Sequence, residues 1–74
     1  IKRYYFKRLH NLKTLNLSFN SLIDIEGDTF FDLENLEELK LNFNKLSILK
    51  YYFFSRLFNL KILELSNNII ESID

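Results

Sequence analysis

Few residues in this sequence have the chemistry to act on a substrate or bind a metal ion. Cysteine is absent and His10 is the only histidine, so no thiolate metal site and no nucleophile paired with a base can be assembled. Glu37 and Glu38 are adjacent on an expected strand, which directs their side chains to opposite sides of a sheet. We therefore expect no catalytic residues, no metal and no cofactor, and we interpret His10 as a solvated surface residue.

The acidic stretch at residues 24–28 is similar to the start of a calcium loop. Asp24, Glu26 and Asp28 alternate along the chain, and carboxylate oxygens are the ligands that Ca²⁺ prefers. The remaining ligand pattern fails, because Gly27 comes two residues too early and Asn35 stands at the twelfth position in place of a bidentate Glu. We predict a solvated loop.

Asn16, Leu17 and Ser18 form an N-glycosylation acceptor pattern. The 74 residues include enough Asn, Ser and Thr for about one such triplet to occur by chance, so the pattern alone does not place the chain outside the cell. A glycan on Asn16 would stand on the solvent side of the expected sheet and restrict binding there.

The composition favours a folded chain without a preference for charged partners. Ten basic and ten acidic residues give a formal net charge of +0, and 47% of the residues are hydrophobic. No apolar run approaches the roughly 18 residues that a membrane helix needs. Balanced charge gives no steering toward nucleic acid or anionic lipid. We expect neither nucleic-acid binding nor membrane insertion.

A spacing of 24 residues recurs through the chain without an insertion. Recurrence of the same residue types at many positions in one register is the sequence signature of a solenoid. The recurring sets are Leu12, Leu36 and Leu60; Leu15, Leu39 and Leu63; Leu17, Leu41 and Leu65; Asn20, Asn44 and Asn68; and Phe6, Phe30 and Phe54.

Three segments of this repeat, residues 14–18, 38–42 and 62–66, alternate apolar and polar side chains. This alternation is typical of half-buried strands. Long crossovers separate the segments, so the strands must pair in parallel. Asn20, Asn44 and Asn68 follow them where the chain turns, and a carboxamide donates and accepts at once. We predict a structural ladder of these Asn side chains and a stack of the recurring Phe rings.

Each unit reads L-x-x-L-x-L-x-x-N-x-L-x-x-[IL]-x-x-x-x-F-x-x-L-x-N, which resembles the leucine-rich-repeat family in its 24-residue typical subclass. The pattern is similar to Toll-like receptor ectodomains and small leucine-rich proteoglycans. The resemblance implies an α/β solenoid, a right-handed superhelix with a concave parallel sheet and an irregular or short-helical convex side. Residues 1–11 would be the convex part of a preceding repeat, 12–35 and 36–59 two repeats, and 60–74 a partial repeat. We expect about three repeats in an uncapped segment of a longer chain.

The strand positions that point away from the core vary from unit to unit, whereas the inward positions repeat. The resemblance implies that this concave side binds a protein ligand, while adjacent repeats of the same chain pack on either side. We call these nine positions the outer sheet face: Thr14, Asn16, Ser18, Glu38, Lys40, Asn42, Ile62, Glu64 and Ser66.

Two groups of aromatic residues leave alternatives open. Phe19 and Phe43 directly precede the ladder Asn, where they would form either an exposed hot spot or half-buried filling of the loop. The convex set would form either a contact surface or, as we favour, pack against neighbouring turns. That set comprises Tyr4, Tyr5, Tyr51, Tyr52 and Phe53, and Phe31 and Phe58 carry the same alternatives.

The leading hypothesis is a non-catalytic, protein-binding segment of a receptor ectodomain or secreted protein, because the resemblance is to that extracellular subclass. The alternative is a cytoplasmic regulatory or scaffold segment attached to a catalytic domain such as a kinase or ubiquitin ligase. Flanking sequence discriminates between them: a signal peptide with cysteine-rich caps supports the first, and a catalytic motif supports the second.

Overall fold

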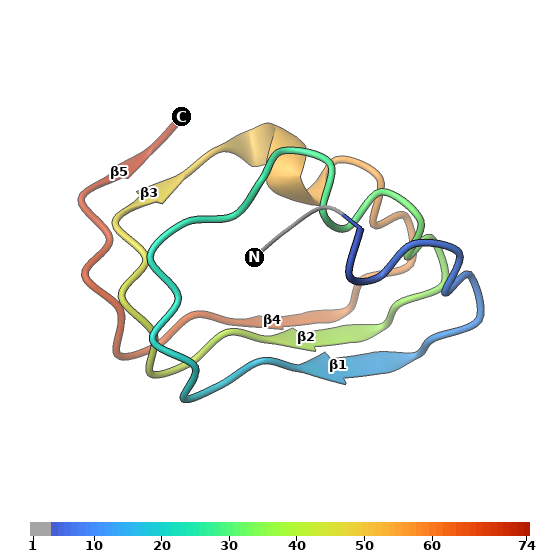
Figure 1. Ribbon diagram of the computed structural model, residues 1–74, viewed down its shortest axis with the longest axis horizontal. Helices are drawn as coiled ribbons and strands as arrows, with labels where there is room; N and C mark the ends of the chain where they lie inside the picture. The colour runs from blue at the N-terminus through green and yellow to red at the C-terminus, as the bar shows by residue number, and fades with distance from the viewer. Residues whose placement is uncertain (1–3) are drawn as a thin grey trace.

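The computed structural model describes residues 4–74, so the first three residues of the predicted 1–11 segment lie outside the described residues. The strands form two parallel sheets (Figure 1). The larger sheet has the order β1-β2-β4 and the smaller pairs β3 with β5. In chain order the elements are β1 (Thr14–Asn16), β2 (Glu38–Lys40), β3 (Ile48–Leu49), the 3-10 helix η1 (Tyr51–Phe54), β4 (Ile62–Glu64) and β5 (Ser72–Ile73).

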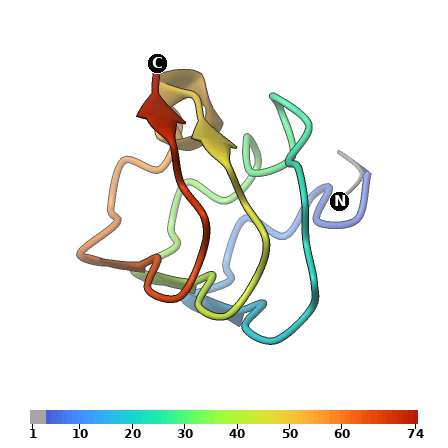
Figure 2. The same ribbon diagram turned by 90° about the vertical axis from the view of Figure 1, so that its left-hand side faces the viewer.

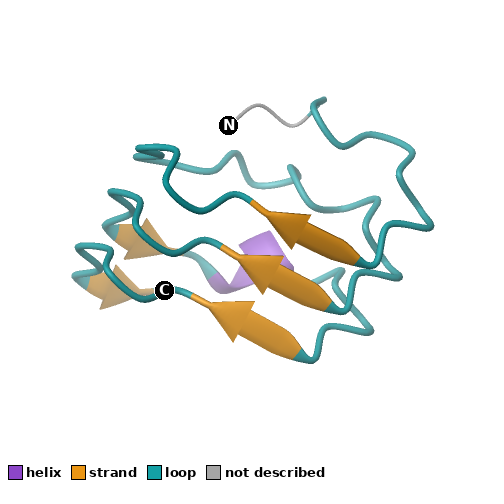
Figure 3. Cartoon of the chain, turned by 90° about the horizontal axis from the view of Figure 1, so that it is seen from below, coloured by secondary structure: helices purple, strands orange, loops and turns teal. Residues whose placement is uncertain are grey.

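Every strand pair is offset by one 24-residue step. Thr14 pairs with Glu38, Glu38 with Ile62, and Ile48 with Ser72. Each pair is therefore joined by one full coil of chain, and the coils lie side by side (Figures 2 and 3). The predicted parallel pairing and its register are confirmed, and the architecture is a solenoid-type repeat fold.

The strands are shorter than the predicted segments 14–18, 38–42 and 62–66. The strands end at Asn16, Lys40 and Glu64. Left-handed backbone follows three residues later at Phe19, Phe43 and Asn67, whose φ angles are 63°, 57° and 58°. Ladder-type bonding nevertheless continues past the strands, since the N–H of Leu17 donates to the carbonyl of Lys40 at 2.8 Å. The turn is set by backbone conformation, which polar and apolar alternation does not encode.

The convex side is mostly irregular, which is one of the two forms that the resemblance implied. Residues 4–74 contain a single 3-10 helix and no α-helix, so the α part of the α/β class is not met. Isolated turns take its place, for example the bonds from Thr29 N–H to the Glu26 carbonyl and from Leu33 N–H to the Phe30 carbonyl. Helical stretches this short are marginal without a longer run of bonds. The β3–β5 sheet was also not anticipated.

The core is concentrated in the middle coil. Leu33, Leu36, Leu39, Leu41 and Leu46 are fully buried. Except for Leu57, which is 8% exposed, their counterparts in the outer coils are less well covered, because a solenoid side chain is buried by the coils on both of its sides. Leucines at equivalent positions of the repeat are therefore buried to different extents, depending on whether their coil has a neighbour on both sides.

The predicted stack of Phe rings runs through all three coils. Phe6 and Phe30 lie with ring centroids 6.1 Å apart, and Phe30 and Phe54 lie 6.4 Å apart, both in stacked orientation. The stack is confirmed, and Phe30 at its centre is buried.

Thr29 and Gly27 occupy sites where a change of side chain should alter stability. Thr29 is buried, and its hydroxyl has no hydrogen-bond partner among residues 4–74. Gly27 lies under Tyr52, so that an added Cβ would stand 3.0 Å from Cε1 of that ring. The absent side chain of Gly27 makes room for the tyrosine.

Candidate outer-face binding site

The outer sheet face is assembled by the β1-β2-β4 register. Equivalent positions are neighbours across the sheet, so Asn16, Lys40 and Glu64 form one row. All nine side chains are at least partly exposed, while Leu39 on the opposite side of β2 is fully buried. Ile62 is the one large apolar member, and it is 47% exposed.

Lys40 and Glu64 are register partners, but the ion pair of Lys40 is with another residue. Its Nζ lies 3.8 Å from Oε1 of Glu38, two positions earlier on the same strand. Both side chains are about one-third exposed, and such partly exposed pairs contribute about 0 to 1 kcal/mol to folding. Glu64 instead accepts a long hydrogen bond of 3.5 Å from the Asn42 amide.

Two asparagines of the outer sheet face also bond the backbone. Oδ1 of Asn42 accepts from the backbone N–H and the hydroxyl of Ser66, at 2.9 and 3.0 Å. Oδ1 of Asn16 accepts from the Ser18 N–H at 3.0 Å. The possible glycosylation residue Asn16 is exposed. Asn42 therefore links two coils in addition to lining the surface, a contact that alternation alone does not reveal.

Asn44 and Asn68 bridge successive coils behind this face. Oδ1 of Asn44 accepts from the N–H groups of Asn20 and Leu22, at 3.0 and 2.9 Å. Its Nδ2 donates to the Leu17 carbonyl at 3.0 Å. Asn68 repeats the arrangement one coil later, with Oδ1 accepting from the Leu46 N–H at 3.1 Å. Asn20 is exposed and contacts only carbonyls of its own coil through Nδ2.

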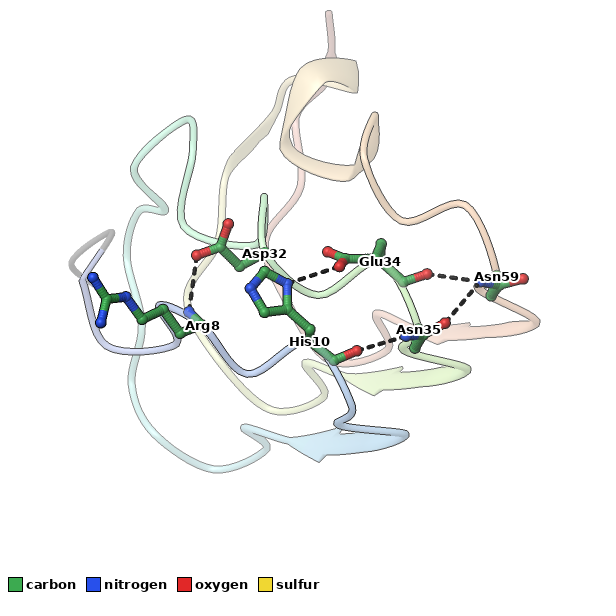
Figure 4. Close-up of polar contacts among 6 residues, drawn as sticks. All are labelled: Arg8, His10, Asp32, Glu34, Asn35 and Asn59. Carbon is green, nitrogen blue, oxygen red and sulfur yellow. Dashed lines mark hydrogen bonds and ion pairs between the residues drawn. The ribbon is translucent and has the colours of Figure 1, made fainter.

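A second asparagine column lies where the chain enters the strands. Nδ2 of Asn35 donates to the His10 carbonyl at 2.7 Å, and Nδ2 of Asn59 donates to the Glu34 carbonyl at 2.8 Å (Figure 4). Sequence reasoning assigned this column no role, although its 24-residue spacing was the available signal. Its contacts join adjacent coils at the edge opposite the first ladder.

His10 is exposed, as expected of a surface residue, and it also contacts the next coil. Its Nδ1 lies 2.7 Å from Oε1 of Glu34, the residue at the equivalent position of the next coil (Figure 4). Next to this pair, the backbone N–H of Arg8 donates to Oδ2 of Asp32 at 2.9 Å. Both contacts hold neighbouring coils together on an exposed surface.

The other acidic residues also serve coil-to-coil contacts or remain dispersed. Glu37 lies between Lys13 and Lys61, with both oxygen-to-nitrogen distances 3.7 Å. Over residues 4–74, no three His, Cys, Asp or Glu side chains gather in a way that would hold a metal ion. No helix in that same range is long and apolar enough to cross a membrane.

The convex aromatic residues divide between packing and exposure. Phe53 is buried in the core, and Tyr52 packs over Gly27 while remaining 39% exposed. Tyr51, Tyr4 and Tyr5 are each more than 60% exposed. Neither the contact-surface interpretation nor the packing interpretation therefore holds for all of these residues.

Phe31 and Phe58 share a cation partner. The guanidinium carbon of Arg56 lies 5.6 Å from the centroid of Phe31 and 5.7 Å from that of Phe58. Phe31 is half-buried, whereas Phe58 is largely exposed. This contact joins adjacent coils as the polar columns do.

Phe19 and Phe43 form the largest exposed aromatic contact beside the outer sheet face. Their rings are stacked with centroids 4.4 Å apart and planes inclined by 8°. Phe19 is 73% exposed and Phe43 is 45% exposed, so the pair does not fill the loop interior. The structure favours the exposed alternative.

Comparison with known proteins gives one family. The family model described as "Leucine rich repeat" matches residues 1–46. Comparison with curated proteins gave no significant match.

Proposed function

The chain belongs to the leucine-rich repeat family, and from this membership we propose that its outer sheet face binds a protein partner. Domains of this family generally act in protein binding. The observation that supports the proposal is the difference in burial between the two sides of β2. Leu39 is fully buried in the core, whereas Glu38 and Lys40 are partly exposed. The side facing solvent is free to differ between coils without loss of the core.

The proposal includes the setting of the chain. We propose a segment of a receptor ectodomain or secreted protein, without catalytic activity of its own, which recognises a protein ligand and neither nucleic acid nor lipid. The balanced charge supports this choice of partner. The alternative is a cytoplasmic scaffold segment linked to a catalytic domain.

Exposed Asn16 provides a test of the extracellular setting. Expression through a secretory pathway should add a glycan that a glycosidase removes, giving a mass shift that Asn16→Gln abolishes. An unmodified Asn16 under these conditions would favour the cytoplasmic alternative. Quantitative modification would confine partner binding to the coils of β2 and β4.

Charge reversal tests the binding surface. The partner, isolated on the immobilised chain and purified, is titrated calorimetrically against Lys40→Glu and Glu64→Lys, singly and together. We expect unfolding free energies to change by less than about 1 kcal/mol, because these groups are partly exposed. Partner affinity should fall by about tenfold or more, because charges at an interface set complementarity.

The convex side supplies the matched control. Tyr51→Ser changes a ring that is 74% exposed and lies outside the outer sheet face, and it should leave partner affinity unchanged. Affinity that withstands both charge reversals but is lost in Tyr51→Ser would place the partner on the convex side and overturn the proposal.

A further inference from the structure

The stacked pair of Phe19 and Phe43 exposes aromatic surface that the core does not use. A large apolar side chain stabilises a fold most when it is buried, because burial removes its apolar area from water. Here the rings bury area mainly against each other, and 73% of Phe19 remains exposed. Exposed aromatic rings next to a polar face are typical of binding hot spots.

The backbone at these positions does not call for phenylalanine. Phe19 and Phe43 have φ angles of 63° and 57°, and Asn67 occupies the equivalent position with a φ of 58°. Left-handed backbone is costly for bulky residues and is tolerated best by Gly and Asn. Asn67 thus shows the residue type that this turn accommodates at lower cost, so both phenylalanines are held against local preference.

The pair lies at the end of the outer sheet face. The N–H of Phe19 donates to the Asn42 carbonyl, and the N–H of Phe43 donates to the Ser66 carbonyl, both at 3.0 Å. Phe19 and Phe43 therefore directly follow the last outer-face positions of their coils, Ser18 and Asn42. A partner segment lying on the outer sheet face, parallel to the strands, would contact the polar side chains of the strands first and then the two rings.

The charges of this face select the partner's chemistry. The nine positions contain two Glu and one Lys, which gives a net charge of −1. Lys40 is paired with Glu38, while Glu64 forms no ion pair with any residue that the structure describes. The uncompensated carboxylate favours a basic group on the partner.

We propose that the Phe19–Phe43 pair and Glu64 together bind an extended segment of a protein partner that carries an apolar side chain near a basic one. The inference rests on the proposed function and specifies the partner. The position equivalent to Phe43 in the coil of Glu64 is Asn67, three residues or about 10 Å of extended chain beyond Glu64, and Phe43 lies one strand spacing of about 4.8 Å to its side. The partner's apolar and basic residues should accordingly stand about three positions apart.

A random dodecapeptide library displayed on phage, selected on the immobilised chain, tests this inference. The diagnostic variant combines Phe19→Asn with Phe43→Asn, which copies Asn67 and so should fold. Glu64→Gln removes the carboxylate, and Glu71→Gln is its control at an exposed position off the face. Circular dichroism of each variant verifies folding before the affinities of synthetic selected peptides are measured.

We expect enriched peptides to pair an aromatic or aliphatic residue with Arg or Lys. Their affinity should fall by about tenfold or more in the double Asn variant and by about threefold or more in Glu64→Gln, with Glu71→Gln unchanged. Failure to enrich any sequence, enrichment without a basic residue, or equal binding to the folded double variant would overturn the inference.

The same peptides separate this inference from the broader proposal. Binding that Glu64→Gln weakens but the double Asn variant retains would leave the outer sheet face as the site and remove the aromatic pair from it. Binding that neither change affects would contradict both.

Discussion

Replacing Asn44 by Ala should destabilise the fold by about 2 to 4 kcal/mol, an amount that follows from which backbone groups lose their last partner. The side chain accepts from the N–H groups of Asn20 and Leu22. Neither N–H has another acceptor among the described residues, and each unsatisfied buried donor costs about 1 to 3 kcal/mol. Asn44 itself is buried, whereas Asn20 is exposed and Leu22 is only partly buried, which favours the lower part of the range.

The carbonyl groups that Asn44 contacts are less affected. The Leu17 carbonyl keeps the amide of Asn20 at 2.8 Å, and the Leu41 carbonyl keeps the amide of Asn68 at 2.9 Å. The penalty therefore arises from the two orphaned donors. For a chain of 74 residues, whose total stability is on the order of 4 to 11 kcal/mol, this loss is large.

A graded series makes the estimate testable. Asn68→Ala leaves one N–H, that of Leu46, without its acceptor and should cost about 1 to 2 kcal/mol. The Asn20 side chain accepts no backbone hydrogen bond from the described residues, so Asn20→Ala should cost less than about 1 kcal/mol. Urea unfolding followed by far-ultraviolet circular dichroism gives the three values, provided that the denaturant slopes agree.

Asn11→Ala is the appropriate control, because Asn11 is exposed and makes no side-chain hydrogen bond within residues 4–74. Asn42 would be a poor control, since it accepts two hydrogen bonds from Ser66. If Asn44→Ala costs no more than Asn20→Ala, the bridging carboxamide is not what stabilises the turn.

Three further predictions concern the packing of side chains between the coils. Thr29→Val should stabilise the chain by about 1 to 2 kcal/mol, because it removes a buried hydroxyl without a partner; an equal loss in urea unfolding would show that the hydroxyl is satisfied. Leu39→Ala should cost about 3 to 4 kcal/mol and Leu63→Ala clearly less, since the first is fully buried and the second 38% exposed; equal midpoint shifts would disprove this difference between coils. Gly27→Ala should be neutral or destabilising while Tyr52 is present and stabilising by about 0.4 to 1 kcal/mol once Tyr52→Ser makes room; thermal melts that show the same sign in both backgrounds would disprove this steric explanation.

The strand register and the Phe stack could be predicted from the 24-residue period, because equivalent residues of a solenoid must lie side by side. Thr14, Glu38 and Ile62 align as that period requires. Strand length was predicted less well, because the alternation of polar and apolar residues continues through 14–18 and 38–42 whereas the strands end at Asn16 and Lys40. The left-handed turns at Phe19 and Phe43 were not predicted either, because phenylalanine does not favour that conformation.

The contacts of the candidate site were predictable only in part. Alternation placed Lys40 and Glu64 on one face, but the choice of Glu38 as the partner of Lys40 depends on side-chain conformation. His10 reaches Glu34 because the coils are in register, a contact that we missed by considering each position singly. The convex turns depend on i to i−3 backbone bonds, and these have no residue signature in this chain.

Photo-crosslinking from single positions measures most directly whether the outer sheet face binds the partner. A photoreactive amino acid replacing Lys40 lies on that face, and one replacing Tyr51 lies on the exposed convex side. Irradiation with the purified partner should yield a covalent complex from position 40 and none from position 51. A complex from position 51 alone would contradict the assignment of the binding surface.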